Sequence, residues 1–374
     1  MDTTQPLPLL GGLTPAQFMK RHWQKKPLLV RGAVPGFQPL LSRAELFDLA
    51  GRDEVESRLV AQTPKGWTFR TGPLARRALP PVSRAGWTLL VQGVDLHHEP
   101  AHELLSRFRF VPQARLDDLM ISYATDGGGV GPHFDSYDVF LLQAQGRRRW
   151  RIGRQKDLSL QEGVPLKVLA NFEPEEEYVL EPGDMLYLPP RYAHDGVALG
   201  ECQTYSIGFR APARAELAQE LLQRLADEAS DMPAGIYADR AQEATPAPGE
   251  IPPQLRAFAR DALNAALDDP LALDRVLGEY LTEPKASVWF EPQVVRGRIR
   301  SVTLDRRTNM MYDAKHVFIN GEGYLASGRD AQLMRRLADD RGLGNADIAR
   351  ASDGALSLLA SWCEAGWAHS GGRA

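Results

Sequence analysis

The chain has 374 residues and a formal net charge of −4, from 44 lysine and arginine and 48 aspartate and glutamate residues, which argues against a dedicated nucleic-acid surface. Its length is enough for a large core and about two or three domains, while its two cysteines, Cys202 and Cys363, exclude a disulfide framework and a cysteine-rich zinc module. The start of the chain lacks the basic and apolar segments of a signal peptide, and no stretch approaches the ~18 apolar residues of a membrane span, which predicts a cytoplasmic protein without a membrane partner.

The N-terminal region is predicted to mix helices and strands. Thr14 is a helix N-cap followed by Pro15 at the first helical position, and Pro27 then leads into a strand. Ser42 and Glu45 have the spacing of a capping box at the start of a second helix. These elements are expected to brace one end of the domain that follows.

Three histidines, His97, His98 and His102, lie around Pro100 at a predicted helix start. A metal site is one interpretation, but no carboxylate lies in register with these side chains. A solvated helix end is the preferred interpretation.

A glycine-rich segment at residues 127–135, GGGVGPHFD, carries the first candidate ligands. The glycines let the backbone turn sharply or approach a ligand closely. His133 and Asp135 are two residues apart on a predicted strand, so both side chains project to the same side and can hold one metal ion. Such a pair is common by chance, so its meaning depends on the surrounding sequence.

Residues 137–152 are predicted to form a β-hairpin. An apolar strand from Tyr137 to Gln143 is followed by a tight turn at Gln145 and Gly146 and by a returning strand from Arg147 to Ile152.

Alternation along the returning strand separates its arginines. Arg148 shares a face with Trp150 and Ile152, whereas the arginines at positions 147, 149 and 151 share the opposite, solvated face. A buried cation is costly unless an anion lies beside it. No acidic residue on the neighbouring inward row is free once Asp135 binds a metal, so a bound dicarboxylate is expected to supply the negative charge.

His194 is the third candidate ligand. It follows an apolar strand at residues 185–188 and the double proline that ends this strand. Two histidines and one carboxylate are typical of a non-haem iron site, in which three coordination positions remain open for substrates. Zinc is possible from the ligand types alone, but a zinc hydrolase would need a nearby general base, and no separate carboxylate is placed for it.

Residues 116–212, and above all the segments LDDLMISYATDGGGVGPHFDSYDVFLLQAQGRRRWRIG and EPGDMLYLPPRYAHDGVALGECQTYSIGFRAP, resemble the bacterial JmjC-type ribosomal oxygenases. The resemblance implies a mixed α and β protein with a double-stranded β-helix (cupin/JmjC barrel) core. It also implies that Fe(II) is bound by His133, Asp135 and His194, that Arg148 holds the distal carboxylate of the cosubstrate 2-oxoglutarate, and that dioxygen is the second cosubstrate.

The chain departs from the family at one position. Ala124 stands where a serine helps to hold the cosubstrate, and Ser122, Tyr123 or Thr125 are candidates to replace this contact.

The resemblance further implies an enzyme that hydroxylates an arginine side chain at carbon 3 in a large-subunit ribosomal protein, protein sixteen, while 2-oxoglutarate is converted to succinate and carbon dioxide. Asp126, Tyr137 and Asp195 adjoin the ligands in sequence and are candidates for contact with that arginine. A turn residue, a barrel-filling aromatic and a strand-start residue are the structural alternatives. Histidyl hydroxylation, lysine demethylation and a ribosome-associated scaffold without turnover are the functional alternatives.

The region after Pro212 changes character. Residues 213–285 are predicted to be helical, with an apolar stripe at Leu217, Leu221 and Leu225. Such helices form a dimer interface or pack back onto their own barrel, and the resemblance favours a homodimer.

The last segment, residues 286–374, is predicted to be a winged-helix-like α/β domain. It alternates strands and helices and carries an Asn-Gly hairpin signal at Asn320 and Gly321. The alternative is a module that caps the helical domain and binds nothing. The predicted domains are therefore 1–212, 213–285 and 286–374.

Overall fold

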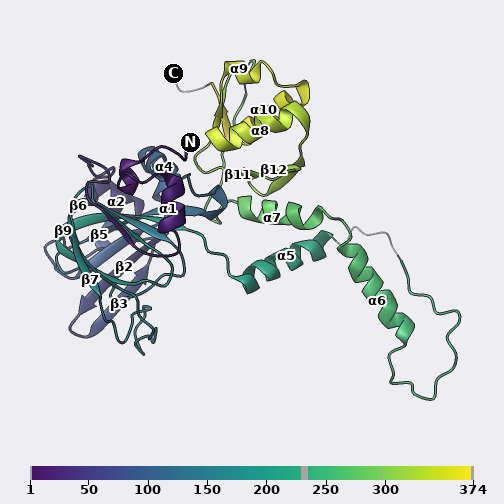
Figure 1. Cartoon of the computed structure of the whole chain (residues 1–374), viewed down its shortest axis with the longest axis horizontal. Coiled ribbons are helices and arrows are strands. Elements are labelled where there is room, and N and C mark those ends of the chain that lie inside the picture. Colours follow the sequence, from purple (N-terminus) through teal and green to yellow (C-terminus); the bar gives the residue numbers. More distant parts are fainter. Residues whose placement is uncertain (1, 229–234, 296, 372–374) are drawn as a thin grey trace. The chain divides into compact units, whose positions relative to one another are not determined.

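The computed structural model describes residues 2–228, 235–295 and 297–371 (Figure 1). The chain divides into two compact units, Met1–Ala211 and Pro212–Ala374. The further division of the second unit at residue 286 remains a prediction. Within the described residues, no helix has the length and the apolar character needed to cross a membrane.

The N-terminal elements begin where the capping signals predict. Helix α1 (Pro15–Arg21) starts after Thr14, whose hydroxyl accepts a hydrogen bond from the backbone of Gln17. Helix α2 (Arg43–Leu49) starts with a complete capping box between Ser42 and Glu45. Strand β1 (Leu28–Val30) follows α1 as predicted. The short helices of this unit are η1 (Pro8–Leu10), η2 (Arg76–Ala78), α3 (Val94–His97), α4 (Glu99–Ser106) and η3 (Gln113–Arg115).

The described part of the first unit contains one antiparallel sheet of nine strands. Its strand order is β1-β8-β6-β9-β5-β4-β2-β3, and β7 pairs with the second part of β6, from Arg148 to Ile152. The strands are β2 (Ser57–Thr63), β3 (Gly66–Thr71), β4 (Trp87–Val91), β5 (Leu116–Ala124), β6 (Val139–Gly153), β7 (Glu176–Leu180), β8 (Met185–Leu188) and β9 (Ala193–Phe209). The two longest strands, β6 and β9, pair along their whole length and curl the sheet into the predicted double-stranded β-helix.

The predicted hairpin at residues 137–152 is wrong. Strand β6 continues through this segment and pairs with β9, from Val139 opposite Gly208 to Gly153 opposite Ala193. The register shifts between Gln143 and Arg147, so the residues predicted to form a turn form a bulge instead. A bulge leaves an extra residue unpaired and bends the strand, and a turn signal in the sequence suits either structure.

The segment predicted to place His133 and Asp135 on a strand is a loop. Its backbone makes one isolated bridge, between His133 and His194. The His133 N–H donates to the His194 carbonyl at 2.9 Å, and the His194 N–H donates to the His133 carbonyl at 2.8 Å. This bridge holds the loop against the start of β9.

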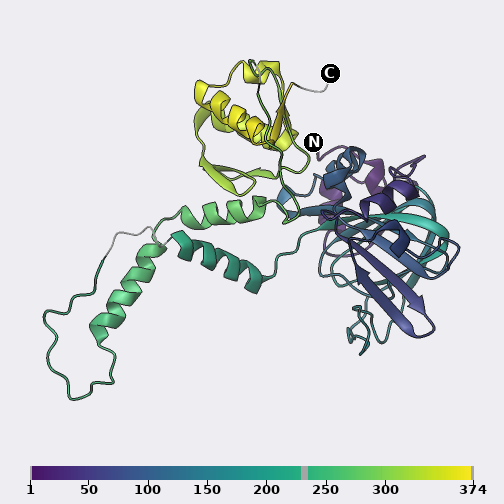
Figure 2. The same ribbon diagram turned by 180° about the vertical axis from the view of Figure 1, so that it is seen from behind.

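The main core of the first unit contains a cluster of packed aromatic rings, here called the aromatic core. Phe18 of α1 packs against Phe140 of β6 and Tyr187 of β8, with ring centroids 5.4 and 4.9 Å apart. The N-terminal helices, drawn in purple and dark blue, cover one side of the barrel in both views (Figures 1 and 2). His97 ends α3, His98 lies between α3 and α4, and His102 lies on α4; all three are half-buried, so this helix end is only partly exposed to solvent.

The second unit begins with the predicted helices, α5 (Arg214–Glu228), α6 (Pro253–Ala266) and α7 (Ala272–Thr282). Leu225 of α5 packs against Ala272 and Val276 of α7. Phe318 packs so closely on α7 that a Cβ at Gly278 would lie 2.3 Å from its ring.

Two small sheets and three helices complete the second unit. Strands β10 (Val302–Leu304), β14 (Gly342–Leu343) and β15 (Ala368–Ser370) form one sheet, and β11 (Met310–Tyr312), β12 (His316–Ile319) and β13 (Glu322–Leu325) form the other. The hairpin predicted at Asn320 and Gly321 is confirmed, because both residues adopt positive φ between β12 and β13. The helices are α8 (Gly328–Asp340), α9 (Asn345–Ile348) and α10 (Asp353–Glu364).

Candidate metal centre and cosubstrate site

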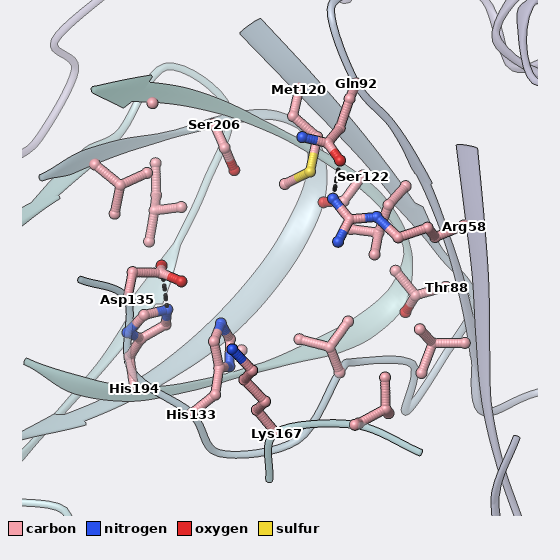
Figure 3. A pocket seen from close by; sticks show the side chains of 18 of the residues that line it. Arg58, Thr88, Gln92, Met120, Ser122, His133, Asp135, Lys167, His194 and Ser206 are labelled. Atoms are coloured by element: carbon pink, nitrogen blue, oxygen red, sulfur yellow. Dashed lines mark hydrogen bonds and ion pairs between the residues drawn. The ribbon is translucent and has the colours of Figure 1, made fainter. Parts of the chain in front are cut away.

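The first unit contains a cavity of about 580 Å³ inside its curled sheet (Figure 3). Side chains from β2, β4, β5, β6 and β9 line it, together with the loops at residues 130–137 and 165–167. The lining is mixed, with apolar side chains between arginines, aspartates and histidines. A concave site with a few converging polar groups is the usual form of a binding pocket for a small molecule.

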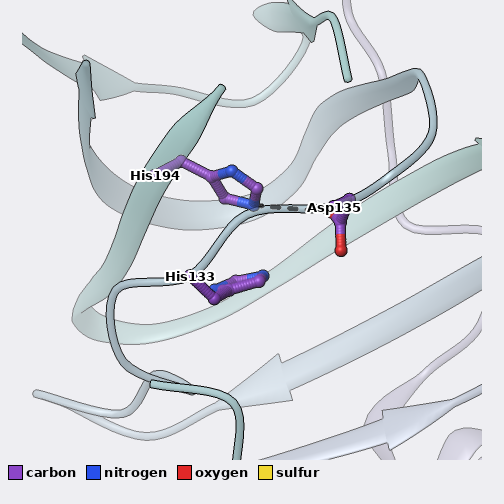
Figure 4. Close-up of side chains that lie close together, drawn as sticks. All are labelled: His133, Asp135 and His194. Carbon is purple, nitrogen blue, oxygen red and sulfur yellow. Dashed lines mark ion pairs between the residues drawn. The ribbon is translucent and has the colours of Figure 1, made fainter. Parts of the chain in front are cut away.

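His133, Asp135 and His194 converge at one end of this cavity (Figure 4). One ligand atom from each residue lies within 4.8 Å of the others. The His194 Nε2 and the nearer Asp135 oxygen are 3.7 Å apart. The two histidine rings have centroids 4.2 Å apart, so both imidazoles face the same space. Three such atoms can bind one divalent ion on a single side.

Backbone carbonyls orient both imidazoles. The His133 Nδ1 lies 2.9 Å from the Gly131 carbonyl oxygen, and the His194 Nδ1 lies 3.0 Å from the Tyr192 carbonyl oxygen. A ring nitrogen beside a carbonyl oxygen carries the proton, so each Nε2 keeps a lone pair for a metal. Burial, together with the nearby His133, lowers the pKa of His194 to about 4, so this ring is neutral at neutral pH.

Arg148 is buried inside the same cavity. Its side chain points to the cavity with Trp150, as the alternation along the strand predicts, and it is 4% exposed. Its Nη1 donates a hydrogen bond of 3.0 Å to Ser122 Oγ, whereas its Nε and Nη2 have no hydrogen-bond partner among the described residues. A buried guanidinium with two unused donors is costly unless an anion binds there. A carboxylate group fits this requirement.

Of the three candidates to replace the family serine at Ala124, Ser122 lines the cavity, whereas Tyr123 and Thr125 do not. Ala124 and Ser122 both lie on the inward face of β5, but only Ser122 lines the cavity and contacts Arg148. Tyr123 belongs to the aromatic core, and Thr125 donates to and accepts from the backbone of Trp87.

The three candidates for contact with a substrate arginine differ in position. Tyr137 lines the cavity, and the residue is 39% exposed. Burial of its hydroxyl and the charges of Asp135 and Asp118 raise its pKa. Asp126 and Asp195 do not line the cavity: Asp126 accepts a hydrogen bond from the Gly200 N–H, and Asp195 pairs with Arg151 at 2.5 Å.

Several cavity residues were not predicted from the sequence. Asp118 and Met120 share the inward row of β5 with Ser122, so alternation along this strand would have found them. Arg58 lies on the opposite wall and donates a hydrogen bond to Gln92 (Figure 3). Lys167 comes from a loop, where no periodic signal exists.

A curled antiparallel barrel with a His-Asp-His group beside a buried, partly unpaired arginine defines the class of iron- and 2-oxo-acid-dependent oxygenases of the cupin fold. Comparison with known proteins narrows this class. The JmjC domain model matches residues 103–217, and a model described as a ROXA-like winged helix matches residues 265–369. The chain belongs to the JmjC-domain ribosomal oxygenases.

Two bacterial relatives support this assignment. The ribosomal protein uL16 3-hydroxylase of Escherichia coli is 36% identical over 282 residues, which cover 74% of this chain and 73% of the relative. A probable ribosomal oxygenase of Haemophilus influenzae is 28% identical and covers 95% of this chain and 96% of its own.

The similarity extends to three dimensions. The crystal structure of E. coli ycfD matches with a TM-score of 0.83 at 30% identity, over 95% of this chain and 98% of that protein. The structure of E. coli YcfD in complex with cobalt and 2-oxoglutarate matches with a TM-score of 0.80 over 96% and 99% of the two chains. The predicted fold class, with its JmjC barrel and winged-helix C-terminal domain, is confirmed.

Proposed function

We propose that this protein is an Fe(II)- and 2-oxoglutarate-dependent hydroxylase of a large-subunit ribosomal protein, the uL16 protein that its E. coli relative is named for. The observation that carries the proposal is the pairing of two features in one cavity. One is the converging group of His133, Asp135 and His194, and the other is Arg148, which has two buried nitrogens without a hydrogen-bond partner in the part of the chain that the structure describes. A 2-oxo diacid that binds a metal through two atoms needs both features, a metal group at one end and a cation for its distal carboxylate at the other.

Each proposed site residue has a distinct task. The Nε2 atoms of His133 and His194 and the carboxylate of Asp135 hold the metal. Arg148, oriented by Ser122, holds the distal carboxylate of 2-oxoglutarate. The bound Fe(II) and 2-oxoglutarate supply the activation of dioxygen. The cavity walls position the substrate C–H group and exclude bulk water.

The metal and cosubstrate assignments have a direct test. Purified protein with Fe(II) is expected to convert 2-oxoglutarate to succinate in step with a mass gain of one oxygen atom on a target peptide. His133→Ala is expected to abolish both. Normal turnover by His133→Ala would reject the metal assignment. No measurable 2-oxoglutarate binding by calorimetry with a redox-inert divalent metal would favour the scaffold alternative.

The cavity also has groups suited to an arginine substrate. Asp117 and Asp118 bring carboxylates to the wall, and Asp118 is 6% exposed. Tyr137 offers an aromatic face at the same cavity. A guanidinium pairs with carboxylates and stacks on aromatic rings, so we propose that these residues receive an arginine side chain and present its carbon 3 to the metal.

Mass spectrometry of ribosomal proteins from cells with and without the gene tests the substrate. We expect one arginine-containing peptide of uL16 to lose the mass of one oxygen atom when the gene is absent. A lost oxygen on a histidine, or a retained methyl group on a lysine, would replace arginine hydroxylation with one of the alternative activities. Asp118→Asn is expected to weaken peptide turnover more than it weakens 2-oxoglutarate binding.

We propose that the helices of residues 213–285 form a homodimer interface. Their exposed apolar side chains support this, namely Leu222, Leu255, Phe258, Leu263 and Leu273. Light scattering after size-exclusion chromatography is expected to give twice the chain mass, and Leu222→Asp combined with Leu263→Asp is expected to give a monomer. A monomeric wild type would instead favour the alternative, in which these helices pack onto the barrel of their own chain.

We also propose a cytoplasmic location for the protein. A ribosomal substrate supports this location.

A further inference from the structure

Trp150 lies between the two ends of the proposed cosubstrate site. The centre of its ring is 5.6 Å from the guanidinium carbon of Arg148 and 5.8 Å from the ring centre of His194. The indole lines the cavity and is only 5% exposed. One side chain therefore lies beside both the proposed carboxylate anchor and a proposed metal ligand.

The pairing of β6 with β9 also places Trp150 between Arg148 and His194 along the strand. Arg148 lies opposite Ala198, Trp150 opposite Gly196, and Ile152 opposite His194. Because a strand advances about 3.3 Å per residue, the levels of Arg148 and His194 are roughly 13 Å apart, with Trp150 halfway between them. A ligand that joins the metal group to Arg148 therefore spans the level of the indole.

Packing alone does not explain this residue. The Trp150 Nε1 is buried and has no hydrogen-bond partner among the described residues, which is unfavourable for a polar group. An apolar side chain in the same cluster, with Leu180, Leu186 and Tyr192, would avoid this loss because it has no polar atom to bury. Gly196 makes room for the large ring, since a Cβ there would lie 2.6 Å from it.

We infer that the ring of Trp150 is the wall against which the methylene carbons of 2-oxoglutarate lie, and that it limits the cosubstrate to a five-carbon 2-oxo diacid. A six-carbon diacid has one more methylene to place between the same two anchors and meets the ring. Trp150 is then a specificity-determining residue of the cosubstrate site. This inference rests on the proposed function.

Calorimetry on the full chain with a redox-inert divalent metal tests the inference without turnover. The titrants are 2-oxoglutarate and its six-carbon homologue, 2-oxoadipate. We expect Trp150→Leu to weaken 2-oxoglutarate binding by about tenfold and to reduce the preference for it over 2-oxoadipate by about tenfold, since one methylene in a fitted pocket is worth roughly 10 to 200-fold. The affinity for the metal alone is expected to remain that of the wild type.

Leu186→Ala is the matched control. Leu186 is fully buried in the same apolar cluster as Trp150, but it does not line the cavity. This variant is expected to lose stability and to keep the wild-type preference between the two acids. If Trp150→Leu does not fold, Trp150→Phe provides the same test with a smaller change in the same direction.

Two results would overturn the inference. One is a folded Trp150 variant with the wild-type preference between the two acids. The other is an equal change of preference in Leu186→Ala. A wild-type protein that binds neither acid would instead reject the proposed function, so the two failures are distinguishable.

Discussion

The two faces of strand β6 bury different kinds of side chain. Phe140 and Leu142 face the aromatic core, where they pack against rings from the N-terminal helices and from β8. Arg148 and Trp150, further along the same strand, face the cavity and carry buried nitrogens without partners. Apolar burial on both faces stabilises the fold, whereas the buried nitrogens of Arg148 and Trp150 that lack a partner among the described residues lower stability and prepare a site for a ligand.

The polar groups nearest Phe140 on the core face have partners. The Tyr187 hydroxyl donates to Asp138 at 2.5 Å and accepts from the Gln24 backbone at 2.8 Å. Asp138 also receives a hydrogen bond from the Gln24 side chain. The unpaired nitrogens of Arg148 and Trp150 are informative because they belong to side chains that line the cavity, since buried polar atoms without a hydrogen-bond partner among the described residues also occur outside it, at the Tyr123 hydroxyl and the Gln203 amide oxygen.

The largest expected effect is on the metal group. His133→Ala is expected to lower metal affinity by more than about 100-fold, because loss of even an outer contact to a metal ligand costs about 10 to 100-fold. The ring is only half-buried, so the free energy of unfolding is expected to change by less than about 1 kcal/mol. Metal titration and chemical denaturation check the two parts, and an intact metal affinity would refute the first.

A substitution on the core face is expected to lower stability and to leave ligand affinity unchanged. Phe140 is fully buried between four other rings. Phe140→Ala is expected to lower the free energy of unfolding by about 3 to 5 kcal/mol through the cavity that it leaves. Calorimetric affinity for 2-oxoglutarate, measured on folded protein, is expected to stay near the wild-type value. A selective loss of 2-oxoglutarate affinity would show that Phe140 also supports the cosubstrate site, which would contradict the distinction between the two faces.

Arg148→Met sharpens the comparison because binding and stability should change in opposite directions. We expect 2-oxoglutarate affinity to fall by about 100-fold, since a buried charge partner is removed. Without ligand, the free energy of unfolding is expected to stay equal or rise by about 1 to 3 kcal/mol, since a buried charge is replaced by an apolar chain. Arg147→Met, at an exposed position of the same strand, is the control and should change neither quantity. A destabilised Arg148→Met would count against this account.

The bulge that joins the two parts of β6 can be tested at Gly146. It has a φ of +61°, and a Cβ there would lie 2.1 Å from the Glu201 carbonyl oxygen. Gly200 also has a positive φ, +81°, but a Cβ there would meet nothing within 4 Å. Gly146→Ala is therefore expected to destabilise the protein by about 1 to 3 kcal/mol more than Gly200→Ala does. Equal losses in denaturation would show that the bulge tolerates a side chain.

The smallest effect concerns a tyrosine of the core. Burial raises the pKa of Tyr205 to about 12, and its hydroxyl accepts a hydrogen bond from the Leu40 N–H. The folded state thus holds this proton more tightly than the unfolded state, so the contribution is complete below about pH 10 and is lost as the pH rises towards 12.

Tyr205→Phe is expected to cost about 1 kcal/mol at pH 7, from the lost hydrogen bond. It should also show a smaller loss of stability than the wild type between pH 10 and 12. Denaturation curves at both pH values measure this difference. An identical loss of stability between pH 10 and 12 in the variant and the wild type would mean that other tyrosines cause this loss.

Short-range patterns in the sequence predicted much of the site. The alternation around Arg148 identified its inward face, although the segment was assigned to a hairpin. The prediction succeeded because it compared Arg148 with Trp150 and Ile152, which all lie beyond the bulge. The same rule applied to Ser122 would have found Asp118 and Met120. Alternation along β5 and β6 does not identify Lys167 or Arg58, because both residues come to the cavity from distant segments.

The sequence by itself determined the caps of the first helices, the alternating rows of the strands and the residue types of the metal group, because each depends on neighbours a few positions away. Only the tertiary structure decided that β6 pairs with β9 and does not fold back on itself, that the His133 loop is held by His194, and that Ser122 supports Arg148. These choices depend on partners far along the chain. Burial of the aromatic core on one side of the sheet brings those partners together and leaves the cavity on the other.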